Sequence, residues 1–224
     1  MAHDPHDHDH PHGHAHGHEH APGADPHAPV AAAEPDGHYQ RLAEATRALL
    51  IEKGYFTADQ MRAMIEKIDA RSPALGARIV AKAWTEPKFK KKLLAGGKKA
   101  LAEIGIDLPI ADLVVVENTA KVHNMVVCTL CSCYPVFVLG RPPDWYKNAP
   151  YRSRAVREPR AVLKEFGTEI AASREVRVHD STADMRYLVL PMRPKGTEGW
   201  SAKELEAIVT RDTMIGVAEV SVPR

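Results

Sequence analysis

The sequence predicts an α+β protein, in which a helical N-terminal arm precedes a layered α-β-β-α domain. Three observations support this fold class. A low-complexity segment opens the chain, helical periodicity extends from residue 39 to about residue 107, and short β-branched runs follow. We therefore divide the chain into a tail over residues 1–36, an arm over residues 37–72 and a main domain over residues 73–224.

The tail is rich in histidine. Ten of the thirteen histidines of the chain lie between His3 and His27, interleaved with Asp, Gly, Pro and Ala. Such a segment cannot bury enough apolar surface to offset the entropy lost on ordering, so we expect it to be disordered. Imidazoles bind Co, Ni, Zn and Cu ions. The tail is therefore either a metal-gathering segment or a solubilising one with incidental metal affinity.

Helical patterning begins with the arm. Apolar residues from Leu42 to Leu50 recur on one face of an amphipathic helix that Gly54 can end. Thr57 and Gln60 form a capping box that opens a second helix. Two further helices are predicted in the main domain, over residues 76–84 and 87–104.

After Asp107 the period changes from helix to strand. We predict strands, with a helix between the second and the third, because the segments are short and β-branched. The strands are expected over residues 113–116, 125–127, 175–178 and 187–190, and the helix over residues 160–166. Ser201 and Glu204 form a second capping box, which opens a closing helix.

Composition excludes several classes of function. The net charge of +1 gives no electrostatic case for binding nucleic acid or an anionic membrane. No stretch approaches the roughly 18 apolar residues of a membrane span, and no apolar signal core opens the chain. We therefore expect a cytoplasmic protein. In that compartment, three clustered cysteines indicate metal binding or catalysis rather than disulfides.

All three cysteines lie in one segment, Cys128–Cys133, which we call the cysteine loop. One interpretation is a Cys₃His zinc site completed by His123. A Cys-x-x-Cys redox pair is another, but it leaves Cys133 without a role. In a third, the three sulfurs and the amides of Ser132 and Cys133 occupy five corners of an octahedron around a trivalent ion. The spacing of the cysteines alone favours the zinc and the octahedral interpretations about equally.

The cysteine loop, continued by Tyr134-Pro135, resembles the metal motif of nitrile hydratase α-subunits. The resemblance covers most of residues 40–217 and therefore leaves out the tail. It extends through Ala81–Pro87, Val116–Thr119, Trp145–Lys147, Tyr151–Arg154, Val156–Arg160, Leu190–Trp200 and Thr210–Val217.

The resemblance implies a metal centre. Its ligands would be the sulfurs of Cys128, Cys131 and Cys133 with the amides of Ser132 and Cys133. Thr129 and Tyr134 are similar to the residues that cobalt-type enzymes have at these positions. The expected ion is therefore Co(III), with Fe(III) less favoured. No organic cofactor is expected. Cys131 and Cys133 would be oxidised to sulfinate and sulfenate.

The resemblance also implies a hydro-lyase that converts small nitriles to amides, with residues 73–224 as its metal-binding catalytic domain. Cys133, Ser132 and Cys131 would be the catalytic residues. It leaves open whether the oxygen on Cys133 or an activated water attacks the nitrile carbon. The expected partners are a nitrile hydratase β-subunit, in an αβ heterodimer or an α2β2 tetramer, and a cobalt-inserting activator protein.

The sequence departs from the family pattern after Tyr134-Pro135. Many relatives have Trp-Pro there, whereas this chain has Val136-Phe137. The substrate pocket, expected at Tyr134, Val136 and Phe137, would therefore have an altered wall. Two rival functions remain at this stage: the catalytic subunit of a cobalt thiocyanate hydrolase, and a non-catalytic metal-binding module.

Overall fold

The computed structural model describes residues 37–109 and 112–223, so the predicted disordered tail lies outside the described residues. The arm consists of α1 (His38–Glu52) and α2 (Ala58–Asp69). The domain begins with α3 (Ala74–Thr85), α4 (Pro87–Ala95), α5 (Gly97–Ala102), β1 (Asp112–Glu117) and β2 (Val122–Val127). It continues with α6 (Val136–Leu139), α7 (Asp144–Lys147), α8 (Ala149–Arg157), α9 (Pro159–Glu165), β3 (Glu175–Asp180), β4 (Met185–Leu190), α10 (Ala202–Ile208) and α11 (Arg211–Ile215).

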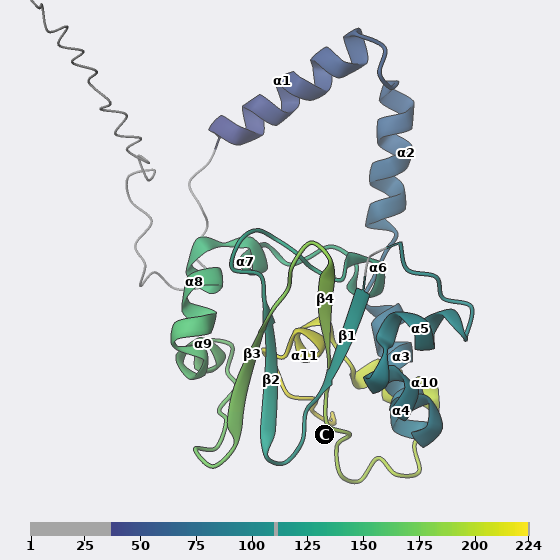
Figure 1. The fold of residues 1–224 in the computed structure, drawn as a ribbon, viewed down its shortest axis with the longest axis vertical. Coiled ribbons are helices and arrows are strands. Elements are labelled where there is room, and N and C mark those ends of the chain that lie inside the picture. The colour runs from purple at the N-terminus through teal and green to yellow at the C-terminus, as the bar shows by residue number, and fades with distance from the viewer. Residues whose placement is uncertain (1–36, 110–111, 224) are drawn as a thin grey trace, which may run out of the picture.

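The arm extends away from the domain (Figure 1). Gly54 adopts a φ of +73°, a left-handed conformation suited to the residue after a helix, and this confirms the predicted end of α1. The capping box of Thr57 and Gln60 is present at the start of α2. Neither helix has a buried residue, so among the described residues the two helices make little packing contact.

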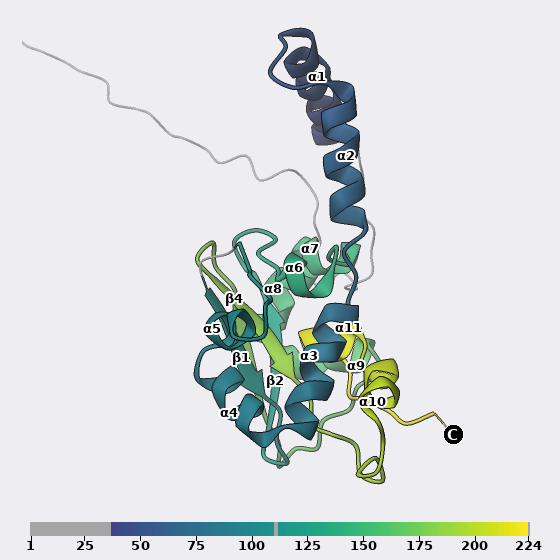
Figure 2. The same ribbon diagram turned by 90° about the vertical axis from the view of Figure 1, so that its right-hand side faces the viewer.

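The domain is built around two small parallel sheets, with β1 beside β4 and β2 beside β3. Helices α4 and α5 pack against β1, and α10 packs against α3, while α8 contacts β2 and α9 contacts β3 (Figures 1 and 2). This confirms the α+β class. The register between β2 and β3 places Val127 opposite Asp180. Because the cysteine loop directly follows Val127, the end of β3 lies next to it.

The helix predicted over residues 87–104 is wrong as a single element. Gly96 has extended backbone, with φ −177° and ψ 95°, and it separates α4 from α5. The paired glycines Gly96 and Gly97 give the physical reason, because glycine has a low helix propensity. A Cβ on Gly97, the first residue of α5, would lie only 2.3 Å from the carbonyl oxygen of Leu113, so the close approach of β1 requires glycine at that position.

The core joins both sheets to the surrounding helices. Met125 and Val127 on β2 and Leu188 and Leu190 on β4 are almost fully buried. An aromatic cluster continues the core beneath the cysteine loop, with edge-on contacts among its rings. Its members are Tyr134, Trp145, Tyr146, Tyr151 and Phe166. In the described part of the chain, no helix is long and apolar enough to cross a membrane.

Candidate metal centre

The three cysteine sulfurs lie together. The Sγ atom of Cys131 is 3.4 Å from that of Cys128 and 3.1 Å from that of Cys133, and all three fall within 4.8 Å of one another. Cys128 is buried, Cys133 is half-buried and Cys131 is exposed. This is a compact set of soft donors open to solvent on one side. The donor set therefore fits a single thiolate-bound metal ion.

His123 is not part of this set, so the Cys₃His interpretation is wrong. Its ring is fully buried, and its Nε2 lies 2.8 Å from the carbonyl oxygen of Gly216, to which it donates. The other nitrogen, Nδ1, faces the amide of Asn118 at 3.5 Å. Burial, as the main cause, lowers the pKa of His123. Both ring nitrogens are thus committed to structural hydrogen bonds.

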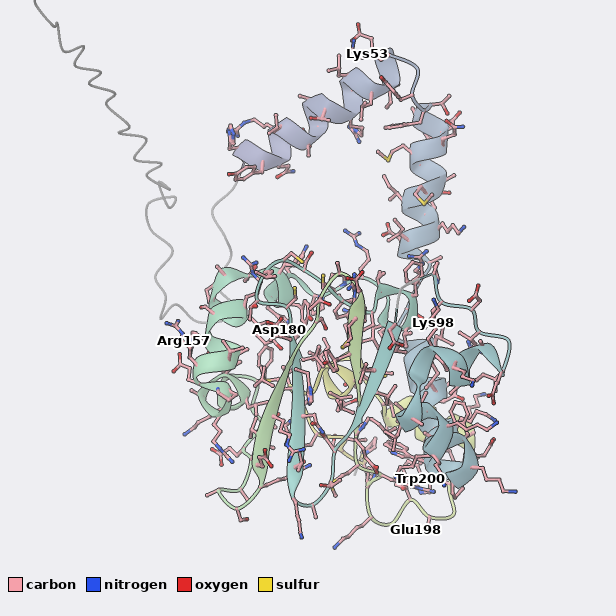
Figure 3. All side chains as sticks on the ribbon, viewed as in Figure 1. Lys53, Lys98, Arg157, Asp180, Glu198 and Trp200 are labelled. Carbon is pink, nitrogen blue, oxygen red and sulfur yellow. The ribbon has the colours of Figure 1, made fainter. Side chains whose placement is uncertain are left out.

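Asp180 attaches the cysteine loop to β3. Its carboxylate accepts hydrogen bonds from the amide of Thr129 at 2.9 Å and from the Thr129 hydroxyl at 2.5 Å. The next residue, Ser181, donates its amide to the carbonyl of Val127 at 2.7 Å. Figure 3 places Asp180 at the ends of β2 and β3 beside the loop. Sequence analysis missed Asp180, whose only signal was an acidic residue ending a β-branched segment.

Two buried tyrosines support the loop from below. The hydroxyl of Tyr146 donates to the carbonyl of Cys133 at 2.9 Å, and that of Tyr151 donates to the carbonyl of Val126 at 2.6 Å. Burial raises the pKa of both phenols, so both remain neutral donors. These bonds restrain the backbone on either side of the cysteines.

The three thiols influence one another. Hydrogen bonds from Cys133 and Cys128 lower the pKa of Cys131, whereas burial and the contact with Cys131 raise the pKa of Cys133 to about 12. The positive charge of Arg186 acts in the opposite direction on Cys133. Arg186 comes from β4, and its Nη1 is buried without a hydrogen-bond partner among the described residues. Arg152 places its Nη1 3.5 Å from the carbonyl oxygen of Cys131.

The residues predicted to line a substrate pocket follow the loop directly. Tyr134 is almost fully buried, packs edge-on against Tyr146 and has a hydroxyl without a partner among the described residues. Val136 and Phe137 lie half-buried in the first turn of α6. Their role in a pocket remains a prediction.

Comparison with known proteins identifies the family. The family model described as "Nitrile hydratase, alpha chain" matches residues 37–218. The chain belongs to this family. A cobalt-containing nitrile hydratase subunit alpha from Pseudonocardia thermophila is 54% identical over 177 residues, which are 78% of this chain and 87% of that one.

Among solved structures, a double mutant of the Fe-type nitrile hydratase from Comamonas testosteroni Ni1 superposes with a TM-score of 0.79. It is 40% identical, and the match covers 85% of this chain and 97% of that one. Thiocyanate hydrolase subunit gamma from Thiobacillus thioparus is also 40% identical, over 85% of this chain and 83% of its own length. The nitrile hydratase alpha-chain fold is thus common to relatives named for cobalt, for iron and for thiocyanate.

Proposed function

We propose that this chain is the catalytic subunit of a cobalt nitrile hydratase, a hydro-lyase that converts nitriles to amides. One observation carries the proposal: three cysteine sulfurs lie within 4.8 Å of one another in a chain that matches the nitrile hydratase alpha chain over residues 37–218. Greater identity to the cobalt-containing subunit than to thiocyanate hydrolase, 54% against 40%, favours nitriles over thiocyanate.

The cysteine loop would hold the metal ion through the sulfurs of Cys128, Cys131 and Cys133 and the amides of Ser132 and Cys133. When bound, trivalent cobalt supplies Lewis acidity that polarises a nitrile or a water. The loop's own contribution is rigidity, because hydrogen bonds from Thr129 to Asp180 and from Tyr146 to Cys133 hold its backbone.

Cys131 and Cys133 are the proposed sites of oxidation to sulfinate and sulfenate. Oxygens on these sulfurs would accept hydrogen bonds, which are strongest from cationic donors. Arg186 supports this proposal because its guanidinium acts electrostatically on Cys133 and has a buried nitrogen with no hydrogen-bond partner among the described residues. Ser132 is exposed between the two cysteines, so its hydroxyl is the proposed positioning group for substrate or water.

A β-subunit is the proposed partner, in an αβ heterodimer or a larger assembly, after loading by a cobalt-inserting activator protein. The arm is the observation that supports a partner, since α1 and α2 enclose a groove of about 590 Å³ and carry exposed apolar residues. The large exposed apolar side chains of these two helices include Leu42, Leu49, Met64 and Ile65. Apolar faces of this kind are typical of protein interfaces. We also propose a cytoplasmic location, where clustered thiols stay reduced until metal binds.

Metal analysis with intact-mass measurement on the co-expressed αβ complex tests the proposal. We expect one cobalt per αβ unit and about three added oxygens on the peptide that contains the cysteine loop. Amide should form from nitrile, without carbonyl sulfide from thiocyanate. Stoichiometric zinc with unmodified cysteines would overturn the metal assignment, and carbonyl sulfide production would favour the thiocyanate hydrolase.

The altered pocket wall at Val136 and Phe137 has its own test. Kinetics on aliphatic, aromatic and bulky nitriles should show a changed preference in a Val136→Trp variant, because a tryptophan removes space beside the loop. An unchanged substrate profile in this variant would refute the pocket assignment.

A further inference from the structure

The base of the arm packs on the helix that follows the cysteine loop. The guanidinium carbon of Arg71 lies 4.2 Å from the centre of the Phe137 ring, which is a cation–π contact. Arg141, just beyond α6, pairs with Asp69 at the end of α2, with a distance of 3.0 Å between Nη1 and Oδ1. Contacts from the arm base therefore reach α6 at Phe137 and the chain just beyond the end of α6.

Gly140 brings the two backbones together between these contacts. A Cβ on Gly140 would lie 2.6 Å from the carbonyl oxygen of Arg71, and its φ of +71° suits glycine. The segment after α6 is thus in direct backbone contact with the arm base. A change in the position of residues 69–72 cannot leave α6 unaffected.

The opposite side of α6 is fixed in the domain. Val138 and Leu139 are fully buried, and a Cβ on Gly76 of α3 would lie 2.8 Å from a methyl group of Leu139. Phe137, by contrast, is only half-buried, and Arg71 covers its ring. The Phe137 ring is therefore the part of α6 whose position depends on the arm.

We propose that Arg71 is a positioning residue that determines which nitriles the site accepts. Arg71 covers the ring of Phe137, which follows Cys133 by four residues and belongs to the pocket wall of the proposed function. The arm is also the docking face proposed for the β-subunit, so docking of that subunit would set the position of Arg71 and hence of the ring. This inference rests on the proposed function and adds a residue outside the cysteine loop that controls its specificity.

Steady-state kinetics of the co-expressed, cobalt-loaded αβ complex test this role. In Arg71→Ala, we expect the KM ratio of a bulky aromatic nitrile to a small aliphatic one to change about two- to fivefold, the range of a cation–π contact. The kcat for the small nitrile should stay within about twofold of wild type. Arg71→Lys, which keeps the charge but not the planar stacking group, should recover part of the change. Arg177→Ala removes an exposed arginine from a different ion pair and should leave the ratio unchanged.

A double-mutant cycle shows whether Arg71 acts through Phe137. In a Phe137→Leu background, Arg71→Ala should no longer alter the KM ratio. Persistence of the effect in that background would overturn the proposal, and so would an unchanged ratio in Arg71→Ala at full cobalt occupancy.

Hydrogen exchange gives a readout that does not depend on nitrile turnover. The amide of Gly140, whose backbone meets the carbonyl of Arg71, bonds to the carbonyl of Val136 at the start of α6. Arg71→Ala in the same complex should accelerate the exchange of this amide, and Arg177→Ala should not. Absence of nitrile hydration in the wild-type complex would refute the proposed function, whereas unchanged exchange in Arg71→Ala would refute the coupling between arm and α6.

Discussion

Asp180 binds Thr129 through both of its carboxylate oxygens, one to the amide and one to the hydroxyl. Thr129 is the second residue of the cysteine loop, and Asp180 is the last residue of β3. Hydrogen bonds to a charged acceptor are roughly twice as strong as neutral ones. This pair therefore fixes the start of the loop. The positions of the cysteine sulfurs thus depend on Asp180, a residue far away in the sequence.

Asp180→Asn should loosen the cysteine loop. The amide side chain keeps one acceptor oxygen but loses the charge, and the site is exposed, so we expect the free energy of unfolding to fall by about 0.5–1.5 kcal/mol. Cobalt occupancy of the purified complex should fall with it. Denaturant unfolding and metal analysis measure these effects. Asp144→Asn is the control because that carboxylate is 98% exposed; equal losses in the two variants would contradict the prediction.

Tyr146→Phe should accelerate loss of metal. The change deletes the hydroxyl that donates to the carbonyl of Cys133 and keeps the buried ring, at a cost of about 1 kcal/mol. Tyr151→Phe is a matched comparison, since it deletes a hydrogen bond to Val126 at a similar depth. The rate of cobalt transfer to a chelator should rise more in the first variant. A larger rise in Tyr151→Phe would show that the loop does not depend on Tyr146.

His123 should make the fold sensitive to acid. Burial lowers its pKa in the folded state, so the unfolded chain binds more protons as the pH falls below about 6.5. The free energy of unfolding should therefore decrease from pH 7 toward pH 5. His123→Gln should be less stable at neutral pH and should show a shallower decrease with acid. Denaturant titrations of the complex between pH 5 and pH 8 measure this slope, and an equal slope in both proteins would exclude His123 as its source.

Ile65→Asp should weaken assembly with the β-subunit. Ile65 is an exposed apolar residue that lines the groove between α1 and α2. A carboxylate there would replace apolar contact area and would lose water on docking, so we expect at least about a tenfold loss of affinity. Sedimentation or surface-binding measurements on the separately purified subunits test this. Glu66→Gln changes an exposed charge on the same helix and should bind as the wild type does.

Removal of residues 1–30 should lower cobalt occupancy when the metal is scarce. The segment contains ten histidines, which would raise the local metal concentration near the same chain. Cells grown at limiting cobalt should yield complex with less metal, while excess cobalt should restore full loading. Unchanged loading at limiting cobalt would leave the tail with a solubilising role alone.

Most secondary structure could be predicted from local patterns. Both capping boxes, at Thr57 and Ser201, are present where the sequence placed them, because their bonds connect residues only three apart. The expected single helix over residues 87–104 was wrong because it breaks at Gly96, the first of two consecutive glycines, which disfavour a continuous helix. The approach of β1 to Gly97 is a tertiary contact that helical periodicity does not record.

The clustering of the three thiols could be predicted from the sequence because they lie within six consecutive residues, and the family could be recognised from motifs spread over residues 40–217. Residues so close in the sequence must also lie close together in the folded protein, so their proximity can be predicted without a structure. The residues that position the loop could not be found in this way. Asp180 is 51 residues from Thr129, Arg186 arrives on β4, and Arg71 meets Phe137 from the arm. Parallel pairing of distant strands and packing of the arm base create these contacts, so only the tertiary structure specifies them.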